Sequence, residues 1–117
     1  MKNNDCSSIE SKEGCLATAL GVLGNKWSAL ILRDLASGSK RFSEFERSLH
    51  GISPRTLSQR LDDLEACGIV TKRSFSETPP RVEYTLTQKG NDIVRALQQM
   101  AQWGEKYYTL RVKEAIK

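Results

Sequence analysis

The chain has 117 residues, which is the length of one domain, and 38% of them are hydrophobic, so it can bury a modest core. Its 18 basic and 14 acidic side chains leave a net charge of +4, which favours an acidic partner. No apolar stretch is long enough to span a bilayer, and the start "MKNNDCSSIESKEG" lacks the apolar core of a signal peptide. We therefore expect a cytoplasmic protein with a flexible arm over residues 1–13.

Three helical segments are predicted before residue 50. "CLATALGVLG" has Leu16, Leu20 and Leu23 at helical spacing. "NKWSALILRDLASG" predicts a second helix that starts at an Asn cap and ends at Gly38. "KRF" is short and extended, and Ser43 is the expected N-cap of a third helix, "EFERSLH".

The stretch "GISPRTLSQRLDDLEACGIV" carries the start and stop signals of a fourth helix. Ser53 is an N-cap candidate, Pro54 fits the first helical position, and Gly68 is the expected C-terminal stop. Only "HGIS" separates this helix from the third, which is the spacing of a helix-turn-helix. One apolar stripe runs along the helix: Leu57, Leu61 and Leu64.

After the fourth helix, apolar residues recur at every second position, which is the pattern of a β-strand. "RVEYTL" alternates apolar and polar residues, "IVTKRSF" is its expected partner strand, and "SETPP" forms the tip of the hairpin. Thr87 is the expected cap of a long last helix over residues 88–114. A helix-turn-helix followed directly by a hairpin is a winged helix, so we predict a mainly α fold (α+β) with a small β-hairpin wing, in one domain over residues 14–117.

Charge and pattern together suggest how such a fold acts. Residues 26–60 hold seven basic and three acidic side chains, a local excess typical of a nucleic-acid footprint or of a solvated basic surface. The fourth helix can enter the major groove, where Arg55 can pair with guanine and Gln59 with adenine. Thr56 and Ser58 can hold phosphates or read bases; the alternative is an ordinary solvated face. Candidate contacts to the DNA backbone are Lys40, Arg41, Lys72, Arg73 and Arg81.

The segments "LGNKWSALILRDL", "GSKRFSEFERSLHGISPRTLSQRLDDLEACGIV" and "PPRVEYTLTQKG" occur in the order and spacing of a known family. Over about residues 15–103 the chain resembles the HxlR-type bacterial transcriptional regulators, winged-helix proteins related to the MarR group. The resemblance implies a homodimer on a pseudo-palindromic operator, paired through the first and last helices, here 15–23 and 88–108. The alternative is that the apolar side chains of these helices pack on their own core. The candidate dimer contacts are Leu16, Leu20, Leu97, Met100, Ala101, Trp103, Tyr107 and Tyr108.

Two acids depart from the family pattern. Asp62 and Asp63 occupy a part of the fourth helix that is often basic or neutral in the family. Because acids near phosphates repel, we expect the second half of this helix to point away from DNA. Arg60 lies closer to the leucine stripe, and pairing with a neighbouring acid is the alternative to a DNA contact for it.

The three cysteines, Cys6, Cys15 and Cys67, form no CxxC pair or Cys/His ligand set, so neither a zinc site nor a disulfide scaffold is expected. Cys15 should begin the first helix, where the helix dipole favours the reactive thiolate. The resemblance makes Cys15 a candidate redox or electrophile sensor, since some members of the family sense through a cysteine near this position. Cys6 is a possible partner, and the alternative for Cys15 is simple burial. Cys67 is expected to serve packing.

The leading hypothesis is a sequence-specific DNA-binding regulator, a repressor rather than an activator. The alternative is a winged-helix module that binds protein or RNA without an operator, because fold does not determine function. An enzyme is disfavoured, since the sequence has no phosphate-binding glycine loop, no metal cluster and only one histidine, His50. No cofactor is expected.

Overall fold

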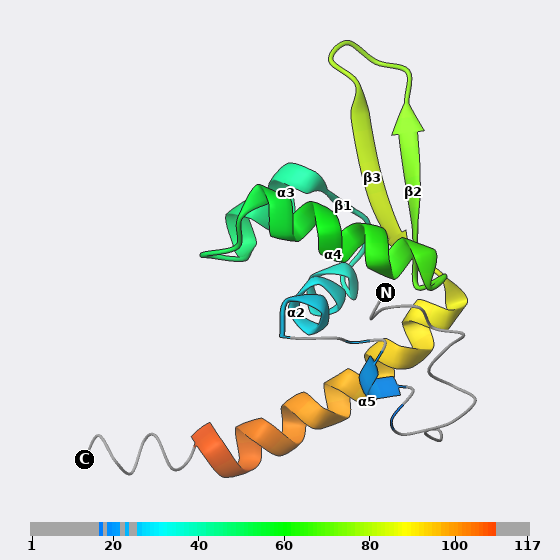
Figure 1. Cartoon of the computed structure of the whole chain (residues 1–117). Coiled ribbons are helices and arrows are strands. Elements are labelled where there is room, and N and C mark those ends of the chain that lie inside the picture. Colours follow the sequence, from blue (N-terminus) through cyan, green and yellow to red (C-terminus); the bar gives the residue numbers. More distant parts are fainter. Residues whose placement is uncertain (1–16, 18, 22, 24–25, 110–117) are drawn as a thin grey trace.

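The computed structural model describes residues 17, 19–21, 23 and 26–109 of the chain (Figure 1). Residues 17, 19–21 and 23 are helical. The elements that follow occur in the predicted order, and no helix among the described residues is long and apolar enough to cross a bilayer. They are α2 (Lys26–Leu35), β1 (Lys40–Arg41), α3 (Phe42–Ser48), α4 (Pro54–Ala66), β2 (Val70–Phe75), β3 (Arg81–Leu86), α5 (Gln88–Gly104) and a π-helical turn, η1 (Glu105–Thr109).

Helix α2 supplies one wall of the core. It buries Ile31, Leu32 and Leu35 and ends at Leu35. The predicted stop, Gly38, lies in the turn that follows and has a φ of 136°, which favours glycine. The Asn predicted to cap this helix, at position 25, lies outside the described residues.

Helix α3 does not begin at the predicted cap. It starts at Phe42, and the backbone N–H of Arg41, the cap residue, donates to Oε1 of Glu44 at 2.7 Å. Strand β1 therefore runs directly into the helix, and Ser43 lies in its first turn. The expectation that Ser43 caps α3 is wrong, because a strand pairing that is remote in sequence determines where the helix begins.

Helix α4 forms as its local signals predict. The Ser53 hydroxyl accepts the backbone N–H of Thr56 at 3.0 Å, Pro54 is the first helical residue, and Gly68 ends the helix region with a φ of 76°. The predicted leucine stripe lies in the centre of the core together with Phe45 of α3. Its residues are all at most 1% exposed: Leu57, Leu61 and Leu64.

The wing belongs to a three-stranded antiparallel sheet in the order β1–β3–β2. Val70 pairs with Leu86 at the base of the hairpin, and Phe75 pairs with Arg81 near its tip. In Figure 1 the hairpin and α5 extend from the helical body in opposite directions. The predicted hairpin of β2 and β3 is confirmed. The short extended segment at Lys40 is the third strand of the sheet, β1.

The base of the sheet closes the core. The ring of Tyr84 meets that of Phe45 edge to face, with centroids 6.2 Å apart. Burial raises the pKa of the Tyr84 hydroxyl above its usual value of 10.0, and the negative charges of Asp62 and Glu65 raise it further.

The start of α5 is joined closely to the end of α4. The Thr87 hydroxyl accepts the N–H of Gly90 at 3.0 Å, which confirms Thr87 as the cap, and donates to the carbonyl of Gly68 at 2.6 Å. Lys89 Nζ donates to the carbonyl of Cys67 at 2.8 Å. These bonds satisfy carbonyls at the helix end that would otherwise lack partners, and they fix the direction in which α5 leaves the body.

Candidate nucleic-acid interface

The outer face of α4 carries the polar side chains predicted to meet DNA. Arg55, Ser58 and Gln59 are exposed, opposite the buried leucine stripe. Thr56 is half-buried, and its hydroxyl oxygen accepts the Ser53 hydroxyl at 3.0 Å while keeping its own O–H to donate. Two turns of a well-capped helix thus present one guanidinium, one amide and hydroxyls at adjacent positions.

The acidic residues in the second half of α4 differ in whether they are exposed or paired. Asp62 and Glu65 are exposed. Asp63 instead forms an ion pair with Arg60, with 3.1 Å between guanidinium nitrogen and carboxylate oxygen. It also accepts the Gln59 side-chain amide at 3.0 Å. The alternative reading of Arg60, as the partner of a neighbouring acid, is confirmed.

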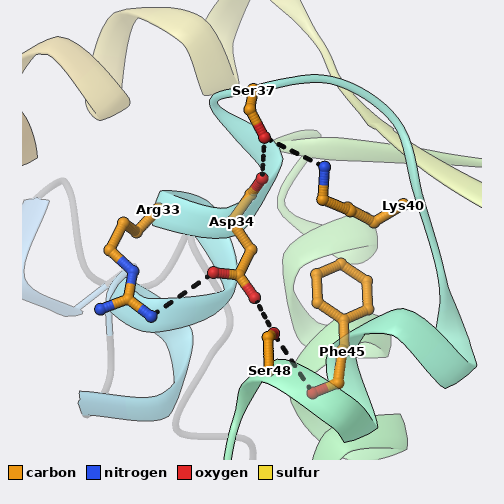
Figure 2. Close-up of polar contacts among 6 residues, drawn as sticks. All are labelled: Arg33, Asp34, Ser37, Lys40, Phe45 and Ser48. Carbon is orange, nitrogen blue, oxygen red and sulfur yellow. Dashed lines mark hydrogen bonds and ion pairs between the residues drawn. The ribbon is translucent and has the colours of Figure 1, made fainter.

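A polar network links α2 to α3 and to Lys40 of β1 (Figure 2). The Asp34 carboxylate accepts the Ser48 hydroxyl from the end of α3 and pairs with Arg33 at 3.4 Å. Lys40 Nζ donates to the Ser37 hydroxyl at 3.0 Å, and that hydroxyl donates to the Asp34 carbonyl. Sequence reasoning missed this network, because nothing in the local pattern shows that Asp34 meets a residue 14 positions later.

The pairing of the strands places the predicted backbone contacts on two faces of the sheet. Lys40, Tyr84 and Lys72 lie in one row across β1, β3 and β2, and directly paired residues point to the same face. Because Tyr84 is buried against the core, the two lysines lie on the core side of the sheet, at its two edges. Arg41 and Arg73 lie in the next row and so occupy the outer face.

Arg81 differs from the other predicted contacts because it is already paired. Its guanidinium lies 3.1 Å from Glu77 and 3.6 Å from Glu83, and 4.1 Å from the Phe75 ring centroid. The guanidinium of Arg73 lies 5.6 Å from the same ring. Arg81 therefore holds the tip of the hairpin together. Lys72 and Arg73 are exposed and form no ion pair with another described residue, so they remain open to phosphate.

The end of α5 and η1 expose large apolar side chains. Met100 is 58% exposed and Trp103 is 57% exposed. The Trp103 ring lies 5.4 Å from the rings of both Tyr107 and Tyr108, which are exposed as well. These aromatics pack on one another, and none of them belongs to the hydrophobic core that the described residues form. Among the other candidate dimer contacts, Leu20 and Ala101 are exposed, Leu97 is partly buried against the core, and Leu16 lies outside the described residues.

A groove of about 450 Å³ between α2 and α5 continues this apolar face. Met100 and Ala101, both exposed on α5, line it. The remaining lining is largely apolar, with one arginine and one amide: Ala29, Leu30, Arg33, Ala36, Val94, Leu97 and Gln98.

The cysteines give a different picture from the sequence-based expectation. Cys67 is buried at the C-cap of α4 and is disulfide-bonded. The interpretation of Cys67 as packing alone is therefore wrong. The other two cysteines of the chain, Cys6 and Cys15, lie outside the described residues. Within the described part, no group of three His, Cys, Asp or Glu side chains is placed to hold a metal ion.

A helix-turn-helix whose second helix exposes polar side chains, followed by an arginine-bearing hairpin, defines a winged helix-turn-helix protein. The model of the HxlR-like helix-turn-helix family matches residues 22–111, and the chain belongs to this family. The predicted resemblance is confirmed.

Relatives and solved structures agree with this assignment. The chain is 38% identical over 101 residues to the uncharacterized HTH-type transcriptional regulator YdeP of Bacillus subtilis, covering 86% of this chain and 79% of YdeP. It is 36% identical over 107 residues to the HTH-type transcriptional regulator YodB of the same organism, covering 92% and 89%. The structure of the redox regulator HypR in its reduced form superposes with a TM-score of 0.77 at 37% identity, covering 83% of this chain and 97% of HypR.

Proposed function

We propose that this protein is a sequence-specific DNA-binding transcriptional repressor of the cytoplasm, not an enzyme, and that it acts as a homodimer on a pseudo-palindromic operator. The observation that carries the proposal is the outer face of α4, where Arg55, Ser58 and Gln59 are exposed opposite the buried leucines. A helix fits the major groove, and these side-chain types match base edges there. The family membership supports the same function.

The contacts would divide into two kinds. Arg55 and Gln59 read bases, while Thr56, Ser58 and the basic residues of β1 and β2 hold phosphates and so fix the register of the helix. The ion pairs of Arg81 suit it to shaping the wing, which brings Lys72 and Arg73 to the DNA backbone. The wing shares one sheet with Lys40 and Arg41, so strand pairing sets the positions of these cations relative to one another.

The homodimer is supported by the exposed face of α5. Trp103, Tyr107 and Tyr108 expose a joined aromatic surface on a small protein, and the groove between α2 and α5 continues it. Exposed apolar patches of this kind mark protein–protein contacts. We propose that a second copy of the chain covers this surface, because a two-fold dimer would also match the two half-sites of a pseudo-palindromic operator.

Direct binding to the DNA upstream of the protein's own coding sequence, measured across a salt series, tests the proposal. We expect nanomolar, sequence-dependent binding that weakens steeply as salt rises, because released counterions drive the phosphate contacts. Weak binding that ignores sequence would contradict the proposal and would favour a winged-helix module for protein or RNA.

Arg55→Ala tests the assigned base contact. We expect the affinity for the operator to fall by about 1–3 kcal/mol, and discrimination to be lost at one base pair in each half-site, because a bidentate arginine–guanine contact disappears. Arg95→Ala is the matched control, since it removes the same charge from an exposed position of α5. Equal losses in the two variants would show that Arg55 contributes only charge.

We also propose that the repressor responds to oxidants or electrophiles through Cys15. Oxidation would join two thiols, with two protons and two electrons passing to an oxidant such as diamide, and Cys6 and Cys67 are the candidate partners. The disulfide at Cys67 lies where α4 ends, beside the Lys89 contact that joins α4 to α5. HypR, which the chain resembles in structure, is itself described as a redox regulator.

Operator binding with and without diamide tests this response. We expect the oxidised wild-type protein to release the operator, the Cys15→Ser variant to keep it, and reductant to restore binding to the wild type. Cys6→Ser and Cys67→Ser identify the partner, because only loss of the true partner prevents the disulfide seen by peptide mapping. Operator binding that diamide leaves unchanged in the wild type would refute the redox response.

A further inference from the structure

Asp63 joins two neighbouring side chains on the flank of α4. Its Oδ1 accepts the Gln59 Nε2 amide at 3.0 Å, and its Oδ2 lies 3.1 Å from the Arg60 guanidinium. Only about a fifth of the Asp63 and Arg60 side chains is exposed, so the ion pair is partly shielded from water. Resting on the proposed function, we infer that Asp63 is a positioning residue that fixes the Gln59 amide for base recognition and thereby sets sequence specificity.

The chemistry of the amide determines its orientation. A carboxylate only accepts hydrogen bonds, so the NH₂ group of Gln59 must face Asp63, and a flipped amide would place oxygen against oxygen. The carbonyl oxygen and the second N–H of Gln59 remain for a base. Adenine offers the matching pair in the major groove, an N6 amino donor and an N7 acceptor. Gln59 thus presents one acceptor and one donor in a known arrangement before DNA arrives.

Order in the free protein also has a direct effect on affinity. An unrestrained glutamine must be immobilised on binding, which costs about two- to ten-fold in affinity for one such side chain. Asp63 holds Gln59 one helical turn away, at the i and i+4 positions that face each other on a helix. The entropy cost of ordering the Gln59 side chain is therefore met when the protein folds and does not reduce the affinity for DNA.

Arg60 explains how an acid is tolerated here. An unpaired carboxylate on a recognition helix repels phosphates, so the sequence alone suggests that Asp63 weakens DNA binding. In the structure its charge is offset by Arg60, whose side chain lies against the body and is about four-fifths buried. Arg60 anchors Asp63, and Asp63 orients Gln59, in a chain of three side chains along α4.

The test is a base-preference measurement with half-sites that carry each of the four bases at each position. Gln59→Ala first identifies the base pair that Gln59 reads. We expect Asp63→Ala to lower the preference for adenine at that base pair by about three- to ten-fold, a part of the discrimination of one bidentate contact, and to leave preferences elsewhere unchanged. Asp63→Asn retains one acceptor oxygen where Asp63 uses two, so it cannot serve Gln59 and Arg60 together, and its NH₂ group would allow the flipped Gln59 amide. We expect it to lower the preference as well.

Asp62→Ala is the matched control, because it removes the same charge from the adjacent position without a contact to Gln59. We expect it to raise affinity for all sequences alike and to leave every preference intact. The inference is overturned if Asp63→Ala shifts affinity uniformly, as Asp62→Ala does, or if preference changes at base pairs other than the one read by Gln59. A wild-type protein that binds every sequence equally would instead refute the proposed function, and the inference would fall with it.

Discussion

Gly90→Ala should destabilise the protein more than any other single-methyl change on α5. A Cβ at this position would lie 2.3 Å from the Ile69 carbonyl oxygen and 2.9 Å from Cδ2 of Leu86. The carbonyl is backbone and cannot rotate away, so α5 must move off the base of the hairpin. We expect a loss of about 3 kcal/mol in the free energy of unfolding, or roughly 10–20 °C in melting temperature, measured by chemical and thermal denaturation.

Gly104→Ala is the control for this prediction. It adds the same methyl to the same helix, but no atom lies within 4 Å of the new Cβ. Alanine is the better helix former by about 1 kcal/mol, so this variant should be as stable as the wild type or more so. Equal stability of Gly90→Ala and wild type would mean that α5 does not pack on Ile69 and Leu86 as closely as the structure places it.

Trp103→Ala should separate the proposed dimer without unfolding the chain. Trp103 is 57% exposed and contacts Tyr107 and Tyr108, so the monomer loses little core packing. Buried tryptophans at the centre of interfaces commonly contribute about 2–4 kcal/mol, which corresponds to about 30- to 1,000-fold in the dimer dissociation constant. Sedimentation equilibrium over a dilution series measures that constant, and operator affinity should fall with it.

Gln102→Ala, an exposed neighbour on α5, is the matched control for Trp103→Ala and should leave the dimer intact. Two results would contradict the prediction. A Trp103→Ala protein that dimerises as tightly as the wild type would place the interface elsewhere. A protein whose melting temperature drops as it does for a core substitution would mean that Trp103 supports the fold of its own chain.

Local signals in the sequence predicted most of the architecture. Helix α4 begins at its Ser–Pro cap and buries its leucine stripe, and the alternation from Arg81 to Leu86 forms the central strand of the sheet. These features depend on residues a few positions apart, and the free energies of capping and of burying one face act within a single element. The exposed base-reading candidates, Arg55 and Gln59, followed from the same periodicity.

Features that depend on contacts between distant segments could not be predicted. The start of α3 follows from the pairing of β1 with β3, and the long last helix gives way to a π-helical turn after Gly104. The Asp34–Ser48 link and the close approach of Gly90 to Ile69 both join segments that are distant in the sequence. No spacing rule within one helix or strand reports such contacts.

The sequence by itself determined the winged helix-turn-helix order and the face of α4 that is turned outward, because period and caps are encoded residue by residue. Only the tertiary structure decided which of the polar side chains are free to bind and which are already engaged. Asp34 is the clearest case, since it accepts the Ser48 hydroxyl from another helix, and a sequence shows a charge but not the partner that folding brings to it. Such a contact forms where the packed backbone brings groups from separate elements together, and that placement is a property of the whole fold.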